Sequence, residues 1–115
     1  QFGRPLAKLG GNAERIADAR IAIDQARLLV LHAAWKLDTA GPRGALSEVS
    51  QIKVAVPNMA QQVIDMAMQL HGGGGFDEAL PLAAAWVSAR SLRMADGPDE
   101  VHRGVIAKLE LAKHR

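Results

Sequence analysis

The chain of 115 residues is long enough for one modest hydrophobic core and too short for two, so we expect a single domain over residues 1–115. Its formal charge is only +2 and acidic residues lie between the basic ones, which argues against a nucleic-acid-binding surface. Cysteine is absent, which excludes disulfides and thiolate metal sites, and no apolar run approaches the ~20 residues of a membrane span.

A first helix is predicted over residues 12–40, after an irregular segment rich in glycine. Asn12 is a suitable N-cap, and Gly41-Pro42 is a suitable end, because proline cannot continue a helix. Apolar residues at alternating spacings of three and four form one stripe: Ile16, Ala19, Ile23, Ala26, Val30, Ala33 and Leu37. The chain begins without Met, and we expect it to be a piece of a longer protein.

A second helix is predicted from Leu46 or Ser47 to residue 70, with the glycine run after His71 as its end. Pro57 lies inside it and is expected to bend the helix without breaking it, since the stripe continues in phase. That stripe consists of Val49, Ile52, Val56, Met59, Val63, Met66 and Leu70.

Two shorter helices are predicted over residues 81–94 and 98–112. Asp99 and Glu100 fall in the first turn of the last helix, where the helix dipole favours negative charge. The expected architecture is therefore all-α, a four-helix and largely antiparallel bundle. Trp35 and Trp86 are interpreted as core residues, and the four methionines as packing residues, namely Met59, Met66, Met68 and Met94.

Four short segments carry a more specific signal. They are Phe2-Gly3, residues 69–76 (QLHGGGGF), Ala89-Arg90 and residues 96–103 (DGPDEVHR). Taken alone, the glycine run indicates no more than a helix end. In this order and spacing, the segments resemble the C-terminal domain of acyl-CoA dehydrogenases over nearly the whole chain. The sequence of residues 95–102 is similar to that found in the branch whose animal members are fused to a kinase-like domain.

The resemblance implies that Asp96 is the catalytic base, at a position where many relatives have Glu. Such a base removes the α-proton of an acyl-CoA thioester while the β-hydrogen leaves as hydride to flavin, which yields a trans-2-enoyl-CoA. The residues themselves leave an alternative, because Asp before Gly-Pro is also a good helix N-cap. Gly97 is implied to lie against the thioester, where a missing side chain allows close approach.

The resemblance also implies FAD as cofactor. Pro98 and Glu100 match positions that contact FAD, although Glu100 is equally explained as a charge at the start of a helix. Phe2 matches a residue that packs at the flavin of the adjacent subunit. The neighbour's FAD is implied to contact the end of the second helix and the turn after it: Gln69, Leu70, His71, Gly72 and Gly73. His71 could instead bond the last helical carbonyls.

Some features depart from the family pattern. The Arg that binds FAD phosphates in relatives, two positions before Phe2, falls outside this chain, and Val87 stands where relatives commonly have Arg. Ala95 replaces the Tyr that often precedes the base, which indicates extra room beside it.

The expected function is that of an FAD-dependent acyl-CoA dehydrogenase acting on fatty acyl-CoA, as a homodimer or homotetramer that passes electrons to an electron-transferring flavoprotein. One alternative is an acyl-CoA oxidase or a nitroalkane oxidase, the latter because it also uses an Asp base. Another is a helical domain that makes subunit contacts without catalysis. The compartment stays open, cytoplasmic in a bacterium or an organellar matrix in a eukaryote.

Overall fold

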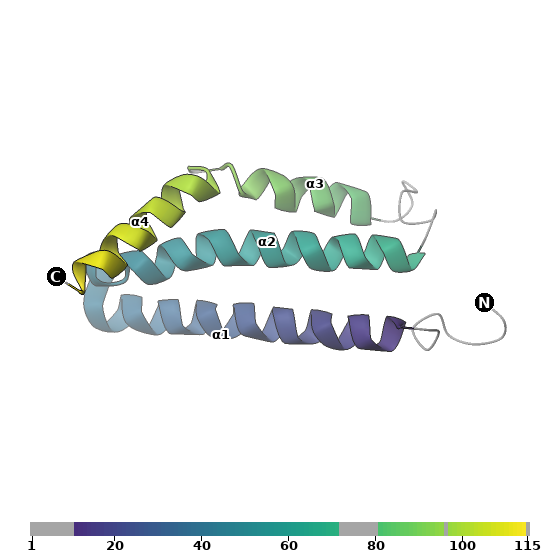
Figure 1. The fold of residues 1–115 in the computed structure, drawn as a ribbon, viewed down its shortest axis with the longest axis horizontal. Helices are drawn as coiled ribbons and strands as arrows, with labels where there is room; N and C mark the ends of the chain where they lie inside the picture. The colour runs from purple at the N-terminus through teal and green to yellow at the C-terminus, as the bar shows by residue number, and fades with distance from the viewer. Residues whose placement is uncertain (1–10, 72–80, 96, 115) are drawn as a thin grey trace.

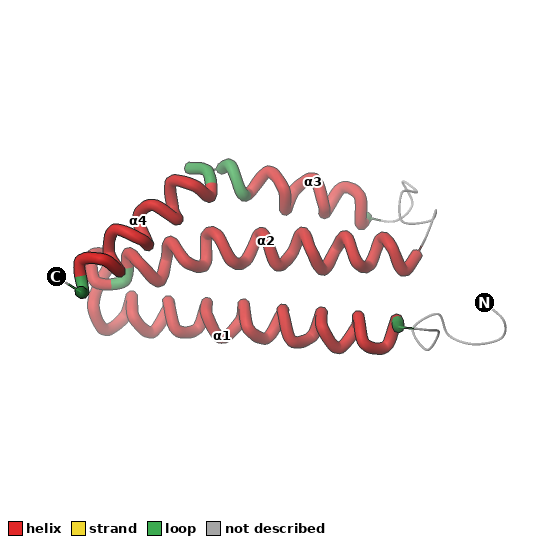
Figure 2. Tube along the Cα trace, viewed as in Figure 1, coloured by secondary structure: helices red, strands yellow, loops and turns green. Residues whose placement is uncertain are grey.

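The structure, a computed structural model, describes residues 11–71, 81–95 and 97–114. In these ranges all regular structure is helical (Figure 2). The helices are α1 (Asn12–Gly44), α2 (Leu46–His71), α3 (Leu82–Leu92) and α4 (Asp99–Ala112). The predicted all-α class with four helices is therefore confirmed. None of the described helices has a stretch long and apolar enough to cross a bilayer.

The long helix α2 is the centre of the arrangement (Figure 1). Helix α1 packs along one side of it, while α3 and α4 follow one another along the other side. Both sides run antiparallel to α2, as predicted. The two short helices together cover one side of α2, and the molecule is elongated, with principal extents of 59, 24 and 24 Å.

Glycine and proline set the boundary between α1 and α2. Regular helix is interrupted at Gly41, whose φ of 75° and ψ of 177° are not helical, so the predicted end at Gly41-Pro42 is correct for the regular part. A short helical turn then continues to Gly44, where a Cβ atom would lie 2.6 Å from the Ala40 Cβ atom. Ala45, between the two helices, is fully buried. Only small residues therefore fit this tight connection.

Two other boundaries test the sequence patterns. Helix α2 continues across Pro57, as predicted. The prediction that Asn12 is the N-cap of α1 was wrong by one residue, because Gly11 takes that position and Asn12 is already helical. Gly11 also provides the first carbonyl of the helix, which accepts a bond from the Arg15 N–H at 3.1 Å.

Small residues line the contacts between the helices. The buried apolar residues among those described are Ala26, Ala33, Ala45, Pro57, Met68 and Ala89, and none of the described large side chains is completely enclosed. In the predicted stripe of α1, Ile16, Val30 and Leu37 remain more than a third exposed. Met59, Met66 and Met68 are half-buried or buried, as expected of packing residues.

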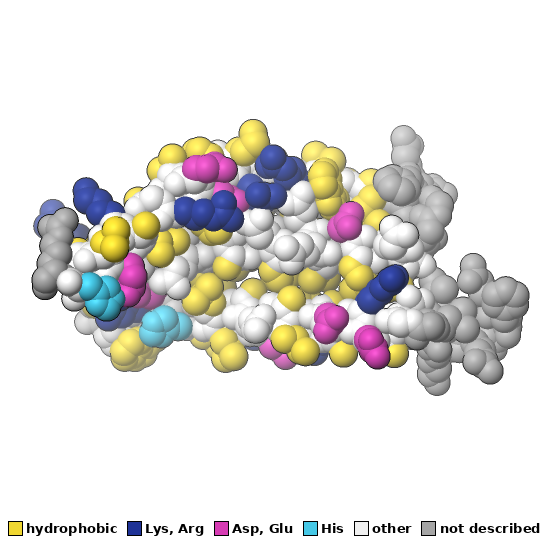
Figure 3. Space-filling model, in the orientation of Figure 1, with side chains coloured by type: hydrophobic (Ala, Val, Ile, Leu, Met, Phe, Trp, Pro, Cys, Tyr) yellow, Lys and Arg dark blue, Asp and Glu magenta, His cyan; other side chains and the backbone are white. Residues whose placement is uncertain are grey.

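Two core predictions were wrong. Trp35 is 58% exposed and Met94 is 61% exposed, whereas Trp86 is half-buried. For Trp35 the reason is the arrangement of the described helices, in which α1 packs chiefly against α2, whereas Met94 lies in the turn after α3. Its outer face carries an exposed apolar stripe: Ile21, Leu28, Leu31 and Trp35. Figure 3 shows apolar side chains at the surface along α1.

Candidate functional site

The turn between α3 and α4 contains the predicted catalytic position. Asp96 itself lies outside the described residues, but its neighbours Ala95 and Gly97 are described. Gly97 has a φ of 99°, a conformation that favours glycine over any residue with a side chain. Ala95 is exposed.

The N-cap position of α4 is occupied by Pro98, whose backbone is extended. The Pro98 carbonyl accepts hydrogen bonds from the Val101 and His102 N–H groups, at 3.0 and 3.4 Å. The alternative in which Asp96 is the N-cap thus lacks the position it requires, since the helix begins at Asp99.

A buried carboxylate, Asp99, lies directly after this turn and is only 2% exposed. Its Oδ2 atom accepts hydrogen bonds from Asn58 Nδ2 and from Arg93 Nε, both at 2.9 Å. Its Oδ1 atom is buried and has no hydrogen-bond partner among the described residues. Because Asn58 belongs to α2 and Arg93 follows α3, this carboxylate joins three helices at one point.

The surroundings of Asp99 determine its charge. Burial on its own raises the pKa of the Asp99 carboxyl, but hydrogen bonds from Asn58 and Arg93 and the positive charges of Arg93 and Arg103 outweigh it. The pKa therefore lies below its ordinary value of 3.8. At neutral pH the group is an ionised partner of Arg93 and a weak base.

The same pair of residues also closes the turn through the backbone. The Asp99 N–H donates to the Arg93 carbonyl at 2.9 Å, so a main-chain bond and a side-chain bond both connect the residues that flank positions 94–98. Arg93 Nη1 donates in addition to Gln61 Oε1 of α2, at 3.0 Å. Both ends of the turn are thereby fixed to the central helix.

The sequence analysis missed this network. Asp99 was interpreted as a first-turn charge, and Arg93 had no assigned role. The sequence does place Arg93 and Asp99 six positions apart, on either side of Gly97-Pro98. This spacing alone does not indicate an ion pair, because the position of the facing helix α2 is not known from the sequence. A polar groove of about 310 Å³ adjoins the network and is lined by Asn58, Gln61, Gln62, Asp65, Trp86 and Arg93.

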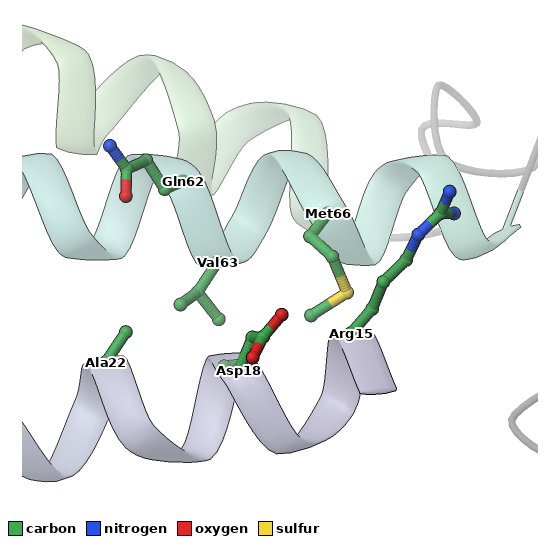
Figure 4. A pocket seen from close by; sticks show the side chains of 7 residues that line it. Arg15, Asp18, Ala22, Gln62, Val63 and Met66 are labelled. Carbon is green, nitrogen blue, oxygen red and sulfur yellow. The ribbon is translucent and has the colours of Figure 1, made fainter. Parts of the chain in front are cut away.

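A second groove, of about 190 Å³, lies between α1 and α2. Figure 4 shows Val63 and Met66 of α2 facing Asp18 and Ala22 of α1 across it. Arg15 stands at the end nearest the start of α1. None of the described residues that were predicted to bind substrate or FAD lines this groove.

The residues predicted to contact FAD do not converge within the described chain. Gln69 is exposed in the last turn of α2 and Leu70 is half-buried, while Pro98 and Glu100 are exposed at the start of α4. The length of α3 separates the two sets (Figure 1), about 16 Å at 1.5 Å per residue. Phe2, Gly72, Gly73 and the His71 side chain lie outside the described residues.

Comparison with known proteins identifies relatives over nearly the whole chain. Residues 1–111 match the protein family described as "Acyl-CoA dehydrogenase, C-terminal domain". The mouse (Mus musculus) protein named acyl-CoA dehydrogenase family member 10 is 49% identical over 110 residues, which are 96% of this chain and 10% of that protein.

Solved structures share the fold. One from Mycobacterium abscessus, assigned to an acyl-CoA dehydrogenase, has a TM-score of 0.95 at 75% identity and matches 100% of this chain and 28% of that one. Butyryl-CoA dehydrogenase from Megasphaera elsdenii has a TM-score of 0.88 at 31% identity, over 96% of this chain and 28% of that one. An FAD complex of PigA has a TM-score of 0.86 at 27% identity, over 97% and 29%. The chain thus spans less than a third of each relative.

Proposed function

Because the chain belongs to the acyl-CoA dehydrogenase family, as its C-terminal helical domain, we propose that it supplies the catalytic base of an FAD-dependent acyl-CoA dehydrogenase. The family predicted from the motifs is confirmed, and it is a family of oxidoreductases. In the proposal, Asp96 removes the α-proton of a fatty acyl-CoA, and the product is a trans-2-enoyl-CoA. FAD, when bound, supplies the acceptor for the hydride that leaves the β-carbon.

The structural roles of Pro98 and Asp99, the neighbours of Asp96 in the turn, support this proposal. Pro98 already occupies the N-cap position of α4, and Asp99 is already an ionised partner of Arg93. Neither task is left for Asp96. A carboxylate in a turn whose ends are fixed to three helices is suited to a role that requires accurate placement, such as removal of a proton.

The residues present fit two edges of FAD sites better than one complete site. Gln69 and Glu100 offer exposed polar side chains to a group outside the chain, and they lie at opposite ends of α3. This separation supports an arrangement in which Pro98 and Glu100 contact the FAD of their own subunit while the Gln69 end contacts a neighbour's. We therefore propose a homodimer or homotetramer, with electron-transferring flavoprotein as electron acceptor.

The exposed stripe of α1 supports the same view. Ile21, Leu28, Leu31 and Trp35 form an apolar surface that water would cover in an isolated domain. A protein of the length of the relatives has further domains and subunits available to bury it.

The test uses a polypeptide that carries this chain within the full length of its relatives, below called the full-length enzyme. Replacing Asp96→Asn keeps the size of the side chain and removes its basic carboxylate. We expect flavin bleaching by acyl-CoA under anaerobic conditions to slow by at least about a hundredfold, the lower end of what a positioned base contributes. Flavin content and substrate binding should change little.

Asp38→Asn is the matched control, because Asp38 is exposed in α1, the helix that packs on the side of α2 opposite α3 and α4. It should bleach at the normal rate. Normal bleaching by the Asp96→Asn variant would refute the proposed role of Asp96 and direct attention to a carboxylate outside this chain.

A second candidate function is favoured by the Asp at position 96, since nitroalkane oxidases of the same superfamily also use an Asp base. An oxidase passes electrons to oxygen. Stoichiometric hydrogen peroxide release during turnover in air would identify the oxidase, whereas reduction of electron-transferring flavoprotein without peroxide would identify the dehydrogenase.

A further inference from the structure

We propose that Arg93, locked between Asp99 and Gln61, is a positioning residue that sets the reach of the base by fixing the turn of residues 94–98. This inference rests on the proposed function of Asp96. Arg93 is not placed in contact with substrate or cofactor. Its effect on the rate would pass through the backbone of the turn.

Two hydrogen bonds between Arg93 and Asp99 close the turn at its ends. The Arg93 carbonyl accepts from the Asp99 N–H, and the Arg93 side chain donates back to the Asp99 carboxylate, each at 2.9 Å. A rotation that opens one end of the turn must break both bonds. The two ends of the turn, at Arg93 and Asp99, are therefore held at a fixed separation.

The pair of Arg93 and Asp99 is also attached to α2 at two points. Asn58 binds Asp99, and Gln61 binds Arg93, so each member of the pair has its own partner on the central helix. Asn58 and Gln61 are three positions apart and share one face of α2. This double attachment fixes the orientation of the turn relative to the rest of the domain in addition to its span.

Arginine is required in this arrangement because two different nitrogen atoms bind two different acceptors. Nε reaches Asp99 and Nη1 reaches Gln61, with the planar guanidinium setting the angle between them. Lysine would keep the positive charge near Asp99 but has one nitrogen on a flexible stem. An Arg93→Lys variant consequently separates the loss of geometry from the loss of charge.

Burial makes the pair sensitive to such a change. Asp99 is 2% exposed, and both of its described side-chain bonds converge on Oδ2, since Oδ1 has no partner. Loss of the Arg93 bond leaves the carboxylate with Asn58 alone. The turn is then held by the main-chain bond between Arg93 and Asp99 and can take a wider range of positions relative to α2.

Because the side chain of Asp96 is short, proton removal by it tolerates little movement of the turn. Asp is one methylene shorter than Glu, about 1.5 Å of reach, so the backbone at position 96 must stand correspondingly closer to the substrate. A misplacement of about 1 Å reduces rates by about a hundredfold. Loss of the Arg93 side-chain bonds is accordingly expected to affect the rate of proton removal more than substrate binding.

The experiment measures flavin bleaching by acyl-CoA in the full-length enzyme, as a limiting rate and a half-saturating concentration, for Arg93→Gln and Arg93→Lys. We expect the limiting rate to fall by about ten- to a hundredfold for Gln and less for Lys, with the half-saturating concentration little changed. Arg43→Lys, at an exposed position at the end of α1, is the control and should behave as the parent.

A double-substitution cycle with Asp96→Glu distinguishes positioning from a purely structural role. Glu is too long for a turn that is locked at the span suited to Asp, but a loosened turn can accommodate it. Asp96→Glu should therefore slow bleaching less in the Arg93→Lys background than in the parent. The single Arg93→Lys variant provides a folded comparison if Arg93→Gln does not fold.

Each outcome is decisive. Additive effects of Arg93→Lys and Asp96→Glu, or a lowered melting temperature with an unchanged limiting rate, would overturn the positioning role while leaving Asp96 as base. Normal bleaching by Asp96→Asn would instead remove the proposed base, and the inference would fall with it.

Discussion

Between α1 and α2 the buried residues are small and apolar, with Ala26 and Ala33 on the seam. On the other side of α2, the buried Ala89 of α3 is accompanied by a polar junction, in which the ion pair of Arg93 and Asp99 binds two amide side chains of α2. Alanine allows close approach of two helices but specifies no direction of contact. Hydrogen bonds to Asp99 require particular distances and angles. The first region provides a stable frame, and the second gives one place on that frame a defined geometry.

The position of the second region explains the difference. The polar junction lies directly beneath the turn proposed to carry the base, while the alanine seam lies on the opposite side of α2. Buried polar groups contribute little net stability compared with apolar packing, yet they are strongly destabilising when one partner is lost. We therefore expect changes in the two regions to be separable by experiment.

The largest effect on stability is expected from Asp99→Ala. The substitution leaves the Arg93 guanidinium and the Asn58 amide without their buried acceptor, which should reduce the free energy of unfolding by about 3–5 kcal/mol. Urea unfolding followed by circular dichroism measures it. Asp38→Ala, at an exposed site, should stay within about 0.5 kcal/mol of the parent; equal losses for both would show that the junction contributes nothing.

A smaller loss is expected when the alanine seam is overfilled. Ala33 is 2% exposed, so Ala33→Leu forces α1 and α2 apart and should destabilise the protein by about 1–3 kcal/mol. The neighbouring Ala34 is exposed, and Ala34→Leu should be nearly neutral. In the full-length enzyme, Ala33→Leu should leave the bleaching rate unchanged; a rate loss as large as that of Arg93→Lys would break the distinction between the regions.

A pair of glycines in or near the functional turn should respond with opposite signs. Gly97 has a φ of 99°, so Gly97→Ala is expected to reduce stability by about 1–2 kcal/mol, although its Cβ atom would meet the His102 ring no closer than 3.4 Å. Gly104 is inside α4 with open space around it, and Gly104→Ala should increase stability by about 0.5–1 kcal/mol. Thermal denaturation of both variants checks the contrast, which a loss of stability in each would contradict.

The smallest expected effect is a dependence of the free energy of unfolding on pH. The folded-state pKa of Asp99 is lowered from 3.8, so its stabilising contribution is fully present above that value and is lost as pH falls through the lower, folded-state pKa. Asp99→Asn removes this titration. The stability difference between the parent and the Asn variant should therefore be constant near neutral pH and shrink below about pH 4; a difference that persists unchanged into strong acid would exclude Asp99 as the cause.

Much of the fold could be predicted from local signals. Gly41-Pro42 and the spacing of apolar residues gave the helices and their antiparallel order, because these signals depend on neighbouring residues alone. The exposure of Trp35 could not be predicted in this way. Periodicity identifies an apolar face but not which part of the protein covers it, and among the described helices α1 packs chiefly against α2.

The site was less accessible to sequence reasoning. Motifs indicated the turn around Asp96 and the glycine run, but the lock between Arg93 and Asp99 depends on where α2 places Asn58 and Gln61. Those partners are more than thirty positions away along the chain, at separations of 41 and 32 residues. Only the folded arrangement brings them to the turn.

The most direct test of the account is a crystal structure of the full-length enzyme with FAD and a non-reacting acyl-CoA analogue. We predict that an Asp96 carboxylate oxygen lies about 3–3.5 Å from the substrate α-carbon, with Arg93 still bonded to both Asp99 and Gln61. A different carboxylate at the α-carbon, with the Asp96 side chain directed away from it, would contradict the account.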